Sequence, residues 1–127
     1  MKKVNIAHVN NEHSYWLRSL NFYKTEISIL KGILTEIAKK NTGTDVMKNV
    51  EHFENQFKVQ TDNIDRLSHN IHANLDRISS QAHDSNAGYI DAALLSEHTS
   101  LSDKFENEVH ILTDMIKSFR TFAGEWM

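Results

Sequence analysis

The chain has 127 residues, of which 39% are hydrophobic and 24% charged, and it contains neither cysteine nor proline. This size fits one soluble domain over residues 1–127, and the missing cysteines exclude disulfide scaffolds, cysteine-ligated metal centres and thiol enzymes. The 14 basic and 17 acidic residues give a net charge of −3 without a basic cluster, so we expect no nucleic-acid partner.

Residues that break helices are scarce, because the chain has no proline and only four glycines. We therefore expect three long helices, at roughly 5–41, 45–82 and 88–126. In the first helix, buried-type residues recur in alternating steps of three and four, which is a heptad pattern. Its positions are Ile6, Val9, His13, Trp16, Leu20, Tyr23, Ile27, Leu30, Leu34 and Ile37.

The second helix repeats this pattern with two polar occupants, Gln60 and Asn74. We call the row of heptad positions that is expected to face the other helices the seam. In the second helix it consists of Val46, Val50, Phe53, Phe57, Gln60, Ile64, Leu67, Ile71, Asn74 and Ile78. Between the two helices, Gly43 suits a left-handed position after a helix end, and Thr42 or Thr44 can cap the next helix.

The third helix carries the pattern with one extra four-residue step near Phe105, where the repeat slips. Its predicted seam is Leu94, His98, Leu101, Phe105, Val109, Leu112, Ile116, Phe119, Ala123 and Trp126. Short connections make consecutive helices antiparallel neighbours. The sequence therefore predicts an all-α, antiparallel, up-down-up bundle of three long helices with coiled-coil-like heptad packing.

Three polar residues, His13, Asn74 and His98, fall on the predicted seams. Counting seam positions along antiparallel helices places the three within about one turn of each other, with His13 opposite Ile71. A buried polar group costs about 1–3 kcal/mol unless it is paired, so the three are expected to bond to each other and to fix the helix register. The alternative is a site for a divalent transition metal, with His13 and His98 as ligands and His72 as the third.

A further layer is expected to join Tyr23, Gln60 and Leu112, with a hydrogen bond from the tyrosine hydroxyl to the glutamine amide. Glu26 and Glu108 border this layer, and both are expected to be solvated.

Motifs for phosphate binding, nucleophilic catalysis, zinc proteolysis and calcium binding are absent from the sequence, so we expect no enzyme and no cofactor. No stretch reads as a signal peptide or a membrane span, and we expect a cytoplasmic protein. Apolar residues outside the seams predict an interaction module that binds a protein partner or itself as a homodimer, without catalysis. These residues are Phe22, Ile29, Ile33, Val59, Leu75, Leu95, Ile111 and Phe122.

Overall fold

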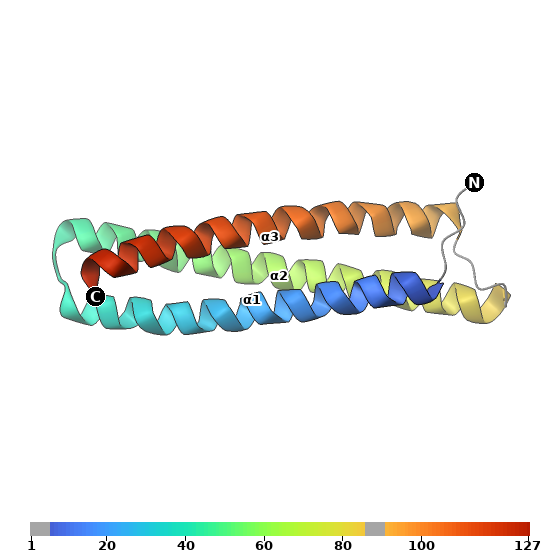
Figure 1. Ribbon diagram of the computed structural model, residues 1–127, viewed down its shortest axis with the longest axis horizontal. Helices are drawn as coiled ribbons and strands as arrows, with labels where there is room; N and C mark the ends of the chain where they lie inside the picture. The colour runs from blue at the N-terminus through green and yellow to red at the C-terminus, as the bar shows by residue number, and fades with distance from the viewer. Residues whose placement is uncertain (1–5, 86–90) are drawn as a thin grey trace.

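Three long helices packed side by side make up the computed structural model, which describes residues 6–85 and 91–127 (Figure 1). They are α1 (Ile6–Lys40), α2 (Thr44–Ser85) and α3 (Ala92–Trp126), and no strand occurs in the described ranges. Helices α1 and α3 run in the same direction and α2 runs against them. The expected all-α, up-down-up three-helix bundle is confirmed.

The helix boundaries lie close to the expected ones. Helix α2 continues to Ser85, three residues beyond the expected end at 82, while the expected starts at residues 5 and 88 lie outside the described residues. Helix α3 begins at Ala92 because the side chain of Asp91 accepts a hydrogen bond from the backbone N–H of Leu94 at 2.9 Å, which makes Asp91 its N-cap.

The turn between α1 and α2 differs from the expected one. Gly43 does not adopt the left-handed conformation, and Thr44 lies inside α2, so neither expectation for the turn holds. The backbone and the side-chain amide of Asn41 instead both donate to the carbonyl oxygen of Ile37, each at 3.0 Å, and satisfy the end of α1. The carbonyl oxygen of Gly43 accepts the first bond of α2, from Met47 at 3.0 Å.

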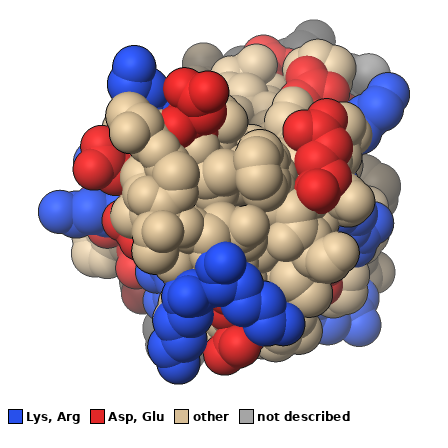
Figure 2. All heavy atoms as spheres, turned by 90° about the vertical axis from the view of Figure 1, so that its left-hand side faces the viewer, with Lys and Arg blue, Asp and Glu red and all other residues tan. Residues whose placement is uncertain are grey.

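Basic residues mark this end of the bundle. The last turn of α1 carries Lys39 and Lys40, where positive charge complements the helix C-terminus. Figure 2 shows Lys and Arg side chains gathered at the lower edge of this end.

One continuous core runs along most of the bundle, and a smaller one lies near the start of α1, where Val9 packs with Ile78. At the far end the core is aromatic: the rings of Phe53, Phe57 and Phe119 pack with centroids 5.3–6.2 Å apart. Each such ring, when buried, contributes about 1.5–3 kcal/mol to folding. None of the described helices carries an apolar segment long enough to cross a membrane.

The expected slip near Phe105 is wrong: the buried positions of α3 keep alternating steps of three and four residues, so the seam departs from the expected one after Phe105. Glu108, Met115 and Phe122 are buried, whereas Val109 is only half-buried and Trp126 is 37% exposed. The apolar pattern of α3 is compatible with two phases that differ by one residue. The helix buries the phase that includes Phe122, and the ring of Phe122 packs against that of Phe53 with the centroids 5.2 Å apart.

Candidate functional site

His13 is fully buried, and both of its ring nitrogens have partners. Nδ1 lies 2.7 Å from the carbonyl oxygen of Val9, one turn earlier in α1, and Nε2 lies 2.8 Å from Oδ1 of Asn74 on α2. Because a carbonyl oxygen only accepts, Nδ1 carries a proton and donates it. Oδ1 of Asn74 is an acceptor as well, so the second bond takes its proton from Nε2 when the ring holds two protons, or from the amide nitrogen of Asn74, turned toward the ring, when the ring holds one. The second bond joins two helices inside an apolar seam and sets their relative position along the bundle.

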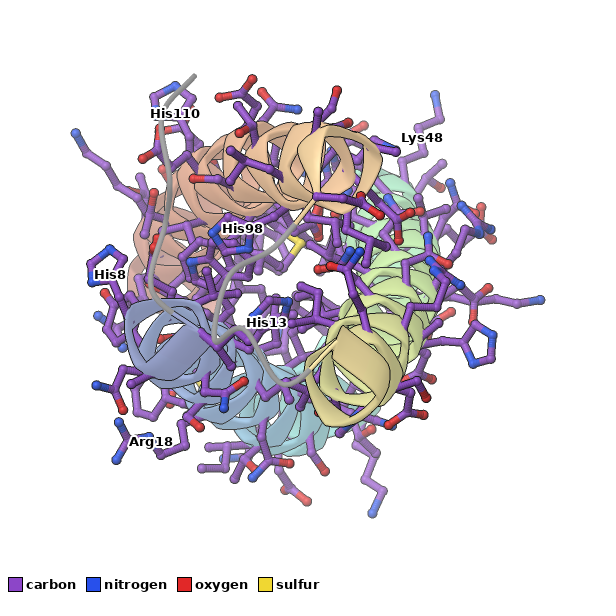
Figure 3. The ribbon with its side chains drawn as sticks, turned by 90° about the vertical axis from the view of Figure 1, so that its right-hand side faces the viewer. His8, His13, Arg18, Lys48, His98 and His110 are labelled. Atoms are coloured by element: carbon purple, nitrogen blue, oxygen red, sulfur yellow. The ribbon has the colours of Figure 1, made fainter. Side chains whose placement is uncertain are left out.

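His98 of α3 packs on the same cluster through its ring. It stacks on Trp16 with centroids 4.9 Å apart and lies 5.0 Å from the ring of His13. Figure 3 shows His13 and His98 directed into the bundle, whereas His8, Arg18 and His110 point outward. His13, Asn74 and His98 therefore lie together as expected, with His13 opposite Asn74 and not Ile71, but only His13 and Asn74 are hydrogen-bonded to each other, whereas Nε2 of His98 faces Glu12.

Glu12 connects this cluster to the surface. Its carboxylate lies 2.9 Å from Nε2 of His8 and 3.4 Å from Nε2 of His98. Burial lowers the pKa of His98 below 6.5, because the charged ring loses its hydration; the Glu12 carboxylate opposes this shift and the nearby His13 adds to it.

The metal hypothesis needs His72 beside His13 and His98. His72 is exposed, whereas the other two are buried. Within residues 6–85 and 91–127 no group of three or more His, Cys, Asp or Glu side chains is arranged to hold a metal ion. A metal at His13 would also have to replace the two hydrogen bonds that its ring nitrogens already make.

Glu108 is a second buried polar group, although a solvated side chain was expected. It is 6% exposed, and burial raises its pKa to about 7, since the carboxylate loses its hydration. The side-chain nitrogen of Gln60, turned toward the carboxylate, donates to both oxygens at 3.1 and 2.8 Å. Gln60 therefore donates to Glu108 and is not bonded to Tyr23, its expected partner. Glu26, the other glutamate beside this layer, forms an ion pair with Arg120 at 3.0 Å.

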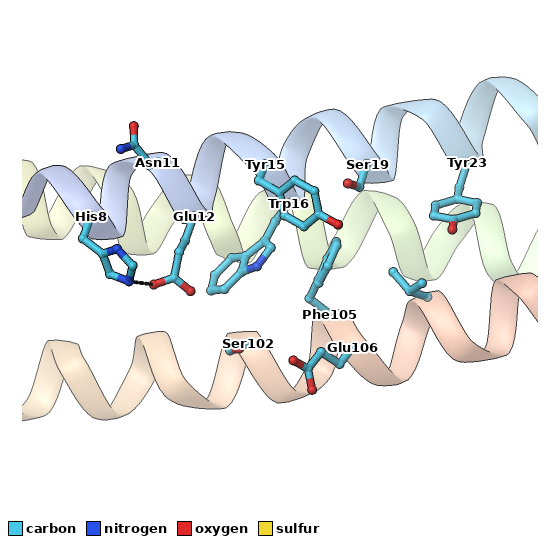
Figure 4. Close-up of a pocket in the computed structure, with 11 residues that line it drawn as sticks. His8, Asn11, Glu12, Tyr15, Trp16, Ser19, Tyr23, Ser102, Phe105 and Glu106 are labelled. Atoms are coloured by element: carbon cyan, nitrogen blue, oxygen red, sulfur yellow. Dashed lines mark ion pairs between the residues drawn. The ribbon is translucent and has the colours of Figure 1, made fainter.

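A groove runs between α1 and α3, the two helices that approach each other least closely. It consists of two hollows of about 590 and about 630 Å³, and Tyr23 lines both. In the first hollow, Tyr15, Trp16 and Phe105 form an aromatic wall with Glu12 and Glu106 at its edges (Figure 4). The second hollow is lined by Phe22 and Tyr23 on one side and by α3 on the other.

The apolar residues outside the predicted seams divide into three groups. Phe122 is buried in the core, and Ile33, Leu75 and Leu95 are half-buried. Phe22, Ile29, Val59 and Ile111 are exposed. Tyr15, which is 58% exposed, belongs with this last group and was missed, although it lies seven residues before Phe22 and fourteen before Ile29.

We expect Asn74→Ala to lower the free energy of unfolding by about 1–3 kcal/mol, because it leaves a ring nitrogen of buried His13 without its partner. The double variant His13→Leu/Asn74→Leu should recover most of this loss, since it removes both polar groups together. Urea unfolding followed by circular dichroism measures both. Asn70→Ala, at an exposed position of α2, is the control; an equal loss there would contradict the role of the bond.

We expect Glu108→Gln to raise the free energy of unfolding by about 2 kcal/mol at pH 8, and by progressively less as the pH falls toward 4.5. The folded pKa of about 7 exceeds the ordinary value of 4.5, so the folded state binds the proton more tightly and wild-type stability falls as the pH rises between these values. Unfolding at several pH values tests this. Glu54→Gln, at an exposed position, should show no such dependence.

We expect the ring of His98 to titrate below pH 6.5 in an NMR experiment, and the midpoint to fall further in Glu12→Gln, which removes the carboxylate that favours the charged ring. Because folding disfavours the charged ring, the contribution of His98 to stability is present above pH 6.5 and is lost as the pH falls through its folded pKa. Asp114→Asn removes the carboxylate beside the exposed His110 and is the matched control, which should leave the titration midpoint of His98 unchanged. A rise of the midpoint in Glu12→Gln would contradict the assignment.

Comparison of the chain with protein families, with curated proteins and with solved structures gave no match.

Proposed function

We propose that the chain is a non-catalytic interaction module that binds a protein through the groove between α1 and α3. The observation that carries this proposal is the exposure of large apolar side chains along that groove. Phe22 is 61% exposed and Tyr15 is 58% exposed, and each lines one of the two hollows. Exposed apolar side chains that line one groove are typical of a binding surface.

The chemistry of the groove favours a helix as the bound element. The two hollows lie between the same two helices and share Tyr23, so together they form a channel along α1 and α3. A helix that presents apolar side chains every three to four residues fills such a channel and completes a four-helix arrangement. Covering one large apolar side chain contributes about 1.5–3 kcal/mol.

The polar clusters support a structural role more than a catalytic one. His13 is held by bonds at both nitrogens, and Glu108 is held by Gln60 inside the bundle. The open groove contains His8, Glu12 and Glu106 beside the aromatic wall. Their charges suit the polar edge of an interface, where they select a partner and its orientation.

Site-specific photo-crosslinking in the cells that make the protein tests this proposal. A photoreactive phenylalanine analogue at Tyr15 or Phe22 should produce a crosslinked species of defined mass. The same analogue at Lys58, an exposed position of α2, should not. Phe22→Glu combined with the analogue at Tyr15 should reduce the product at least tenfold, because a charge then replaces the apolar contact.

Crosslinking of the Lys58 position as strong as that of Tyr15 and Phe22 would contradict the proposal, as would the absence of any product from the two groove positions. Circular dichroism of purified Phe22→Glu serves as the folding control. Since Phe22 is exposed, its replacement should leave the free energy of unfolding of the single chain within about 0.5 kcal/mol of wild type.

A further inference from the structure

The groove between α1 and α3 changes its charge along its length. Carboxylates line the first hollow, whereas basic side chains predominate in the second. Among the described residues, the acidic and basic ones that line the two hollows are His8, Glu12 and Glu106 in the first, and Glu26, Lys117 and Arg120 in the second. A helix that lies along the groove has to match both ends of this pattern, so the pattern limits what the groove accepts.

The negative charge of the first hollow is not balanced within the chain. Glu106 forms no ion pair with any residue in the described ranges, and no described lysine or arginine lines the hollow. Glu12 faces His8 and His98, and burial lowers the pKa of His98, so that this ring is mainly neutral at pH 7. Arg18 lines neither hollow, and Figure 3 shows it on the side of α1 that is turned away from α3. The balancing positive charge therefore has to come from a bound partner.

The second hollow presents positive charge. Arg120 is paired with Glu26 at 3.0 Å, whereas Lys117 is exposed and has no ion-pair partner in the described parts of the chain. Lys117 follows Glu106 by eleven residues on α3, which separates the two by about 16 Å along the helix axis. Two unpaired charges of opposite sign thus lie about three turns apart on the same wall of the groove.

The aromatic wall of the first hollow favours one kind of cation. Tyr15 is 58% exposed, and its ring packs on that of Phe105 with centroids 5.9 Å apart. Figure 4 shows carboxylates beside this wall, Glu12 on α1 and Glu106 on α3. The guanidinium group of arginine is planar, stacks on aromatic rings and donates two parallel hydrogen bonds to a carboxylate, whereas the ammonium group of lysine is compact and strongly hydrated. The combination of rings and carboxylates therefore suits an arginine.

We propose that the helix bound in the groove carries an arginine that lies against the ring of Tyr15 and pairs with Glu106, and an aspartate or glutamate about three turns away that pairs with Lys117. This inference rests on the proposed function and names the chemistry of the partner. Apolar side chains at steps of three and four residues between these two charges cover Phe22 and Tyr23. The partner is an amphipathic helix with opposite charges at the two ends of one apolar stripe.

Other occupants match only one end of the groove. A nucleic acid or an anionic membrane surface would set its phosphates against Glu12 and Glu106. A uniformly basic helix would meet Lys117 at the second hollow, and a uniformly acidic helix would meet the two carboxylates at the first. Like charges that face each other across an interface cost free energy and suppress binding. A helix with one charge of each sign avoids both conflicts.

Mass spectrometry of the crosslinked species locates the partner residues that face each hollow. The photoreactive phenylalanine analogue is placed at Tyr15 in one variant and at Thr113, which lines the second hollow, in another. We expect the two variants to link the same segment of one protein. An arginine should lie within one turn of the residue linked from Tyr15, and an aspartate or glutamate within one turn of the residue linked from Thr113.

A synthetic peptide of the linked segment then tests the charge match on the purified full chain. Glu106→Arg should raise the Kd about tenfold or more, because two like charges then face each other. Replacing the arginine of the peptide by glutamate should restore binding to this variant. Glu54→Arg, at an exposed position of α2, is the matched control and should leave the Kd unchanged. Circular dichroism should show the same helix content for Glu106→Arg and wild type, since Glu106 makes no ion pair within the described ranges.

Lys117→Glu tests the other end in the same way. It should weaken binding of the peptide, and a peptide in which lysine replaces the acidic residue should bind this variant as wild type binds the original peptide. Failure of either exchanged peptide to restore binding would overturn the inference, as would a linked segment that lacks the arginine.

The two proposals fail in distinguishable ways. If Tyr15 and Phe22 crosslink a partner whose segment lacks these charges, or if the Kd does not respond to Glu106→Arg, the charge match is wrong and the groove remains the binding surface. If neither position yields a product, both proposals are wrong.

Discussion

The hydrogen bond between His13 and Asn74 is the constraint on which the alignment of the bundle depends. Apolar seams with a heptad repeat pack almost equally well when one helix slides by a turn or a heptad, so apolar burial alone does not select one alignment. A polar pair inside the seam removes this freedom, because any slide leaves two buried polar groups without partners. Once α1 and α2 are aligned, α3 follows, since His98 stacks on Trp16 beside His13. The same alignment sets the level of the aromatic wall of the α1/α3 groove along the bundle.

Much of the architecture could be predicted from the sequence, because it depends on local features. The absence of proline and the stepwise apolar pattern specify three helices, and short turns make them antiparallel. The predicted alignment of α1 on α2 differs from the observed one by one seam position, because it places His13 opposite Ile71 and not opposite Asn74. That step is set by the pairing of individual polar groups, which the pattern of apolar residues does not encode. The phase of α3 after Phe105 escaped prediction for a related reason: two phases bury similar numbers of apolar residues, and Phe122 decides between them through the ring of Phe53.

The candidate site was less predictable than the fold. His13, Asn74 and His98 were identified because polar residues in a seam are conspicuous. Tyr15 was missed because it falls outside the seam of its helix, and only the spacing to Phe22 and Ile29 signals it. Glu108 was expected in solvent, and its burial arises from the tertiary contact with Gln60. The groove itself follows from the looser approach of α1 and α3, which is a property of the assembled bundle and of no single helix.

The odd number of helices has a mechanical consequence. The start of α1 and the end of α3 lie at opposite ends of the bundle, in which these two helices of 35 residues each span about 50 Å (Figure 1). A pulling force applied at these two points acts along the helix axes and loads the contacts between the helices in shear. Contacts loaded in shear must all slip together, whereas a bundle whose ends lie side by side opens one contact at a time.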